Sequence, residues 1–157
     1  MNVLVLCDDT WHPARVPRDG LAGLGTSGFS FDFIESVAGW SPERIVQYPL
    51  VILTKSDNSS SADKKGWMTE AIQMAFLEYV RKGNGLLAIH SGTAGWGEMS
   101  ILRGLLGGVF DHHPPECPVT VEPLPGHPLT AGCKKFKLRD EHYFMTLDDT
   151  QADIFLT

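Results

Sequence analysis

The sequence predicts an α/β fold in which a doubly wound, mostly parallel sheet lies between two layers of helices. Short, continuously apolar segments at residues 2–7, 50–54 and 86–90 have the composition of parallel strands that are buried on both faces. A helical pattern precedes the last of them, at residues 67–82, where apolar residues recur with a spacing of 3.6. Strands that alternate with helices are typical of the flavodoxin-like, three-layer α/β/α arrangement.

Composition indicates one domain of ordinary globular type and excludes several partners. The 157 residues are 43% hydrophobic and 20% charged. A net charge of −6 without a sizeable basic cluster disfavours nucleic acid, and no apolar run approaches the roughly 20 residues of a membrane span. The three cysteines, Cys7, Cys117 and Cys133, lack a paired metal spacing and indicate reduced thiols, so we expect a cytoplasmic protein.

The amino-terminal part is expected to supply strand, loop, helix and strand in turn. The first strand, residues 2–7, runs into a polar loop in which Pro13 delays any helix. Residues 18–25 are expected to form a short helix. At residues 29–35 aromatic and polar side chains alternate with the period of a half-exposed strand.

The rest of the chain continues the alternation until a region rich in proline and glycine. The expected elements up to that region are a helix starting at Ser41 with Pro42 in its first position, a strand at 50–54, a surface loop at 55–65, a helix at 67–82 ending before Gly83, the central strand at 86–90 and a helix at 100–106. Beyond it we expect a loop at 112–115, strands at 118–122 and 135–138 joined by a turn at 125–128, and a strand that begins at 154.

The strand at 86–90 ends in a glycine-rich turn that presents His90 at the carboxyl edge of the sheet. Ala88 and Gly92 stand where a nucleophile elbow has its small residues, but the residue between them is neither serine nor cysteine. An imidazole in this place suits general acid–base catalysis or metal ligation. The alternative is a histidine that only caps the turn.

Four segments occur in the order typical of a known family: DDTWHP after the first strand, then GLLAIHSGTAGW, LLGGVFDHHPP and GHPLTAGCKKFKLRDEHYF. Through them the chain resembles the trehalose-utilisation (ThuA-like) family over nearly its whole length. The resemblance implies the fold of class I glutamine amidotransferases and a role in the metabolism of a trehalose-type disaccharide or a keto-sugar. Amidotransferases of this fold hold a cysteine at the elbow, so His90 predicts the absence of glutaminase activity.

The resemblance also implies that residues 1–157 are a single ThuA-like domain that is short at its carboxyl terminus. Such a domain would expose an apolar sheet edge, which proteins usually cover by pairing. We therefore expect a homodimer or a larger homo-oligomer.

Further polar residues are expected beside His90 at the carboxyl edge. His12 follows the first strand, so its ring is expected to face the same crevice. Asp140 and Glu141 follow the strand at 135–138, and the resemblance implies that Glu141, and less so Asp140, is an acid–base or hydrogen-bonding partner. The candidate catalytic residues are therefore His90, Glu141 and His12. The candidates for binding a substrate are Trp11, Trp96, Asp140, Tyr143 and His113. For each of them an ordinary role as a core or solvated side chain is the alternative, and His127, before Pro128 at a turn, is expected to be structural.

The histidines also make a divalent metal, Zn²⁺ or Mn²⁺, the one cofactor that the sequence suggests. The candidate ligands are His12, His90 and His112, with Glu141, although no local spacing is a metal signature. His112 and His113 are adjacent, so on an extended segment only one of them can enter the shared site.

Two functions remain open at this point. The first is a sugar-processing enzyme, a hydrolase or a lyase or isomerase, that acts on a small sugar-like ligand. The second is a non-catalytic ligand-binding or structural member of the same fold.

Overall fold

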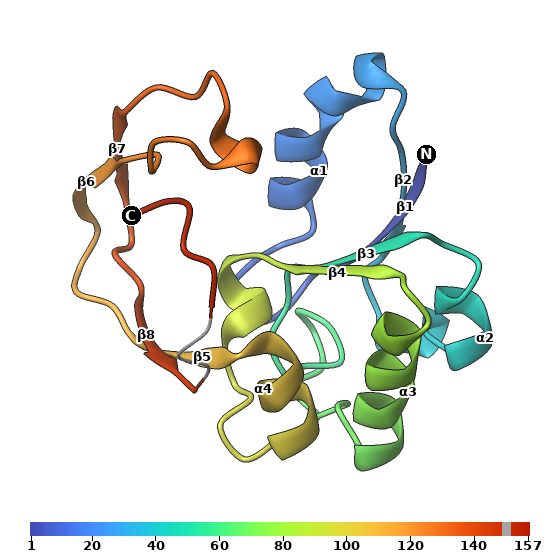
Figure 1. Cartoon of the computed structure of the whole chain (residues 1–157). Coiled ribbons are helices and arrows are strands. Elements are labelled where there is room, and N and C mark those ends of the chain that lie inside the picture. Colours follow the sequence, from blue (N-terminus) through green and yellow to red (C-terminus); the bar gives the residue numbers. More distant parts are fainter. Residues whose placement is uncertain (149–151) are drawn as a thin grey trace.

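A parallel sheet of four strands forms the centre of the structure, a computed structural model that describes residues 1–148 and 152–157 (Figure 1). The strands are β1 (Asn2–Leu6), β2 (Ser30–Ile34), β3 (Leu50–Leu53) and β4 (Gly85–Ala88). They lie in the order β2-β1-β3-β4, and every neighbouring pair is parallel. All four carboxyl ends therefore meet at one edge of the sheet.

Helices cover both faces of this sheet, which confirms the predicted three-layer α/β fold (Figure 1). Helix α1 (Arg15–Ala22) lies on one face, and α2 (Pro42–Ile45), α3 (Glu70–Arg81) and α4 (Ser100–Leu106) lie on the other. Because side chains alternate along a strand, β1 supplies both layers of the core. Leu4 and Leu6 pack in the larger cluster with residues of α2, α3 and α4, while Val3 and Val5 pack in the smaller cluster toward α1.

Side-chain caps set where two of the helices begin. Ser41 accepts a hydrogen bond from the Arg44 N–H at the start of α2, as its helix-start pattern predicts. Helix α3 begins three residues later than predicted, at Glu70, because Thr69 is its cap. The preceding Trp67 is held outside the helix by Asp57, whose Oδ1 accepts from the Trp67 backbone N–H at 2.8 Å.

Residues 55–65 form the predicted loop, but the prediction that this loop lies at the surface is wrong for its first residue. Lys55 is fully buried. Its ammonium donates to the Ser59 carbonyl at 2.9 Å and lies 5.7 Å from the centre of the Trp67 ring. Burial lowers the pKa of Lys55, while the carboxylates of Asp8, Asp9 and Asp57 oppose that shift.

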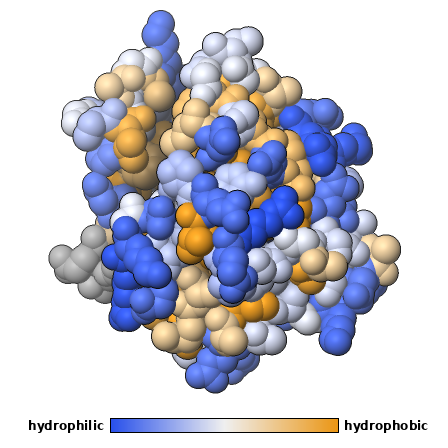
Figure 2. Space-filling model, turned by 90° about the vertical axis from the view of Figure 1, so that its right-hand side faces the viewer, coloured by the Kyte–Doolittle hydropathy of each residue, from blue (hydrophilic) through white to orange (hydrophobic). Residues whose placement is uncertain are grey.

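Strand β4 lies at an edge of the sheet in the described part of the chain, so its predicted central, fully buried position is wrong. Leu87 and Ile89 are 46% and 40% exposed as a result. The opposite side of the molecule carries the amino ends of the strands and α2, and there hydrophilic residues surround smaller hydrophobic patches (Figure 2).

The carboxyl-terminal part consists of two antiparallel pairs rather than further strands of the main sheet. Strand β5 (Gly108–His112) pairs with β8 (Phe144–Leu147), and β6 (Cys117–Val121) pairs with β7 (Phe136–Asp140). The pattern predicted β6 and β7 but neither β5 nor β8, and His112 belongs to β5 rather than to a loop. Residues 154–156 contribute one isolated bridge, Pro123 with Leu156, in place of the predicted strand.

Four short 3₁₀ helices complete the described structure: Gly23–Ser27, Val37–Gly39, His90–Thr93 and Pro128–Thr130. Within residues 1–148 and 152–157, every helix is too short or too polar to cross a membrane.

The burial of the three free thiols predicts their order of reactivity. Cys7 is buried and Cys133 is exposed, and burial is the main reason why the pKa of Cys7 rises to about 11. We expect an aromatic disulfide reagent to modify Cys133 first and Cys7 only after unfolding, as mass spectrometry of digested protein would show. Modification of Cys7 at the rate of Cys133 in the native protein would contradict the placement of β1.

The exposed edge of β4 predicts self-association. A charged side chain at such an edge opposes pairing, so Leu87→Lys is expected to shift the protein toward the monomer, and the same change at exposed Leu24 serves as control. Light scattering of the unmodified protein should give at least twice 17.3 kDa. The monomer mass at micromolar concentration would contradict this prediction.

Candidate functional site

His90 occupies a tight turn at the carboxyl end of β4, in a backbone conformation that is unusual for a residue with a side chain. Its φ is +52°, in the left-handed region. Two residues later only glycine fits, because a Cβ on Gly92 would lie 1.9 Å from the Leu53 carbonyl oxygen. Ser91 donates from its hydroxyl to the Thr54 carbonyl at 2.8 Å and so ties the turn to the end of β3. The residues whose sequence resembles a nucleophile elbow therefore form such a turn in the structure, with the His90 imidazole at its tip.

Two side chains from the segment between β7 and β8 meet the His90 ring. The Tyr143 hydroxyl lies 2.9 Å from His90 Nε2, and the two rings stack with their centres 4.3 Å apart. Glu141 Oε2 lies 3.4 Å from the same nitrogen. The His12 ring approaches His90 edge-on at a centre distance of 4.9 Å. Two distant parts of the chain, the loop that carries His12 and the segment with Glu141 and Tyr143, thus converge on the His90 imidazole.

The surroundings favour a neutral imidazole and a protonated phenol. Burial is the largest cause that lowers the pKa of His90, and the neighbouring His12 adds to it, while Glu141 opposes the shift. Burial, followed by the negative charge of Glu141, raises the pKa of Tyr143 to about 12. Tyr143 therefore has a proton to donate, and His90 Nε2 can accept it.

His12 is oriented by Asp9, a fully buried carboxylate in the same loop. Asp9 Oδ1 lies 2.8 Å from His12 Nδ1 and also accepts from the backbone N–H groups of Trp11 and His12. Asp9 Oδ2 accepts from the backbone N–H and the hydroxyl of Ser56, after β3. Burial alone would raise the pKa of Asp9, but these donors outweigh it and hold the pKa well below its ordinary value.

Two cavities open beside His12. One, of about 480 Å³, is lined by both polar and aromatic groups: Trp11, His12, Ser56, Phe110, His113, Glu141 and Tyr143, with Ala94 and Gly95. The other, of about 380 Å³, lies between α1 and the end of β4 and has mainly apolar walls, among them Val16, Pro17, Leu21 and Ile89. His12 lines both cavities, and His90 and Asp140 line the second.

Comparison with known proteins identifies the family. The family model ThuA, described as trehalose utilisation, matches residues 2–157. This chain belongs to the ThuA family. A crystal structure of a ThuA-like protein from Bacteroides uniformis superimposes with a TM-score of 0.71 at 20% sequence identity, over 99% of this chain. At this identity the superposition shows a shared fold, and the chain spans 66% of the length of that relative. No curated protein matches the chain significantly.

In this ThuA family member, His12, His90, Glu141 and Tyr143 form one cluster. Most of the other site residues predicted from the sequence lie around it. Trp11 is 78% exposed at the rim of the larger cavity. Asp140 lies at the end of β7 and accepts from the Glu141 backbone N–H. His113 Nε2 lies 3.7 Å from Glu141 Oε2. Of the two adjacent histidines, His113 is thus the one that enters the site.

Two of the predicted site residues, Trp96 and His112, lie elsewhere. Trp96 is fully buried in the core and donates from its indole to the Gly92 carbonyl at 2.7 Å, so its predicted role as a platform for a ligand is wrong. His112 stacks on Phe144 and contacts Asp111 with most of its side chain exposed. It points away from His113 along β5, so it cannot join His12 and His90 in one ligand set.

His127 is structural, as expected. It caps the short helix Pro128–Thr130 by accepting from the Leu129 N–H, and its other nitrogen contacts Asp153.

Asp9, Ser56 and Phe110 also belong to the site, and the sequence did not predict them. A signal for Asp9 was present, since a carboxylate three residues before a histidine at a strand end is well placed to bind its ring. Ser56 and Phe110 gave no such signal, because only the folded loops bring them into the cavity.

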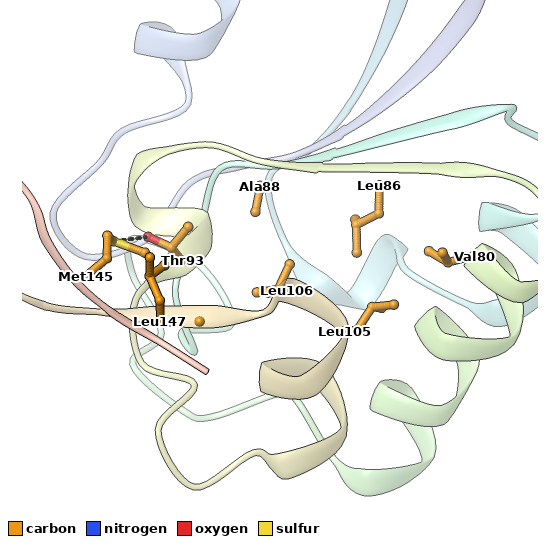
Figure 3. Close-up of a pocket in the computed structure, with 9 residues that line it drawn as sticks. Val80, Leu86, Ala88, Thr93, Leu105, Leu106, Met145 and Leu147 are labelled. Carbon is orange, nitrogen blue, oxygen red and sulfur yellow. Dashed lines mark hydrogen bonds between the residues drawn. The ribbon is translucent and has the colours of Figure 1, made fainter. Parts of the chain in front are cut away.

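A third cavity, of about 280 Å³, lies apart from this cluster, between β4, α3, α4 and β8 (Figure 3). Leu86 and Ala88 of β4 face Leu105 and Leu106 of α4 across it. Its lining holds no titratable side chain, so it offers no group for acid–base chemistry.

The hydrogen bonds of Asp9 predict a pH-dependent contribution to stability. In Asp9→Asn the amide NH₂ would have to face one of the N–H donors, so we expect a loss of about 1–3 kcal/mol in the free energy of unfolding near neutral pH. Because the pKa of folded Asp9 is lowered, this stabilisation is present above the unfolded value of about 3.9 and is lost as the pH falls toward the folded value.

Denaturant unfolding of the unmodified protein and of Asp9→Asn, between pH 7 and about pH 2, tests whether the charge of Asp9 stabilises the fold. The difference between them should shrink as the pH falls, whereas exposed Asp19→Asn should change little at any pH. A difference that stays constant over this range would show that the charge of Asp9 does not stabilise the fold.

Proposed function

We propose that this member of the ThuA family is an enzyme that transfers protons on a sugar-derived small molecule, with His90, Glu141 and Tyr143 as its catalytic groups. The convergence of these three side chains at the carboxyl edge of the sheet carries the proposal, because open α/β sheets bind their ligands at this edge. The family description, trehalose utilisation, favours a trehalose-type disaccharide or a keto-sugar as the substrate class.

The three groups have complementary roles in such a reaction. A carbon–hydrogen bond next to a carbonyl is acidic enough for removal by a positioned base, and His90 and Glu141 are the candidates for that base. As the proton leaves, its electron pair moves toward the carbonyl oxygen, which Tyr143 can stabilise by donating a hydrogen bond. Return of a proton to a neighbouring carbon gives an isomerase, and departure of a glycosidic oxygen with a proton gives a lyase.

The lining of the larger cavity suits a sugar ring. Trp11 offers an exposed aromatic face at its rim, and aromatic faces pack against the apolar side of a sugar. His113 and Ser56 add polar groups on the walls that can bind hydroxyls. The half-exposed position of His90 and Glu141 allows a substrate to reach both.

Glutaminase activity is not part of the proposal. The imidazole of His90 stands where amidotransferases of this fold have their catalytic thiol. Cys7, which follows β1, cannot replace that thiol, because it is buried and its pKa is raised.

The activity test compares His90→Asn with the unmodified protein. We expect trehalose with one ring hydroxyl oxidised to a ketone to be consumed by the unmodified protein in NMR-followed incubations, while trehalose itself, which has no carbonyl group, should remain unchanged. Loss of a general acid–base group should lower the rate by about 10²- to 10⁴-fold. His112→Asn removes a nearby histidine outside the cluster and should retain the rate.

Two outcomes would contradict the proposal. Equal rates for His90→Asn and the unmodified protein would remove His90 from catalysis. Binding of both sugars without turnover of either, measured by calorimetry, would favour the non-catalytic ligand-binding function instead.

A further inference from the structure

The geometry points to a binding site for one divalent transition-metal ion, Zn²⁺ in the first place, held by His12, His90 and Glu141. One ligand atom from each of these residues lies within 4.8 Å of the other two. Among the described residues this is the one group of histidine, cysteine and acidic side chains that converges in this way. The site rests on the proposed function and deepens it by naming its cofactor, but it can be tested without any substrate. With the ion bound, a water on the ion would replace His90 and Glu141 as the base. The Tyr143 hydroxyl, which lies 2.9 Å from His90 Nε2, would then turn from that nitrogen toward the substrate.

The distances are close to those that an ion requires. Zinc binds histidine nitrogen and carboxylate oxygen at about 2.0–2.2 Å, so neighbouring ligand atoms of a tetrahedral ion lie about 3.4 Å apart. His90 Nε2 and Glu141 Oε2 already have this separation, at 3.4 Å. Side-chain rotations that move the ligand atoms by about an ångström would bring all three within bonding distance of one ion. All three side chains are only partly buried, which leaves room for such rotations.

The contact between Asp9 and His12 is the independent observation that favours an ion. Histidines that bind a metal usually direct their other ring nitrogen to a carboxylate, which sets the tautomer and the orientation of the ring. His12 has this arrangement, because its Nδ1 lies 2.8 Å from Asp9 Oδ1. Nδ1–H then donates to Asp9, and the free electron pair of Nε2 is available for an ion. Asp9 itself is fully buried and fixed by Ser56, so the orientation of His12 is built into the fold.

The ligand types select the class of ion. Two imidazoles and one carboxylate suit Zn²⁺, Mn²⁺ or Fe²⁺ and disfavour Ca²⁺ and Mg²⁺, which prefer oxygen ligands alone. Three protein ligands also leave coordination positions for water or substrate, as in catalytic rather than structural zinc sites. Those positions would face the larger cavity, where Tyr143 and His113 line the wall.

Metal binding by tag-free protein, freed of metal with a chelator, tests the site directly. Titration calorimetry with ZnCl₂ should show one ion per chain, and Co²⁺ should give a visible absorption spectrum. Glu141→Gln and His12→Ala should each weaken Zn²⁺ binding at least 100-fold. Asp9→Asn, a positioning change, should weaken it by about 10- to 100-fold. His112→Asn and His127→Asn are matched controls that should bind as the unmodified protein does.

Circular dichroism of each variant shows whether it folds. If His12→Ala does not fold, Glu141→Gln still tests the site, because Glu141 is partly exposed and its replacement should not disturb the fold. Absence of Zn²⁺ and Co²⁺ binding at micromolar concentration, or unchanged binding in Glu141→Gln, would overturn the inference. The outcome is separable from that of the proposed function. Metal binding without turnover of either sugar leaves the site standing, and turnover by the metal-free protein at full rate removes the site from the reaction.

Discussion

The structure of the site depends on one buried charge, the carboxylate of Asp9. An ionised carboxylate without water is costly unless hydrogen bonds replace its hydration. Here the loop after β1 and the start of the loop after β3 supply those hydrogen bonds from His12, Trp11 and Ser56. Because the bonds bind both loops to one anion, they hold two neighbouring strand ends together and aim the His12 ring at His90.

Backbone strain marks the same edge of the sheet. The two described residues other than glycine with a left-handed backbone are Asp8, with φ +71°, and His90, with φ +52°. Each such residue costs on the order of 1–3 kcal/mol and persists only where its surroundings hold it. Asp8 is held by hydrogen bonds that its carboxylate accepts from the Ala14 and Ser61 N–H groups. His90 is held by the turn around Gly92, which packs against the Leu53 carbonyl. The two strained residues therefore lie just after β1 and β4, on either side of His12 in the sequence of the site and next to the side chains that form it.

The parts of this arrangement that follow from short-range rules could be predicted from the sequence. The apolar runs of β1 and β3, the Ser41 cap and the elbow at His90 each depend on a few neighbouring residues. The convergence of His12, His90 and Glu141 could be predicted because parallel strands end at one edge and because the family resemblance placed Glu141.

Features that depend on distant partners could not be predicted. Nothing in the run at β4 distinguishes an edge strand from a central one, since only the order of strands decides that. Trp96 has the same local pattern whether it packs in the core or faces a ligand. The buried state of Lys55 depends on Ser59 and on Trp67, which lies further along the chain, shortly before the next helix. Likewise, the pairing of β5 with β8 joins segments separated by two other strands.

The central claim is that His12, His90 and Glu141 form one site. Anomalous diffraction from a crystal of the protein grown with ZnCl₂, recorded on both sides of the zinc absorption edge, tests it most directly. If the three residues hold one ion, the map will show one strong peak per chain within about 2.2 Å of a nitrogen of His12, a nitrogen of His90 and an oxygen of Glu141. Electron density that places Glu141 and His12 on separate surfaces, with no peak beside His90, would contradict it.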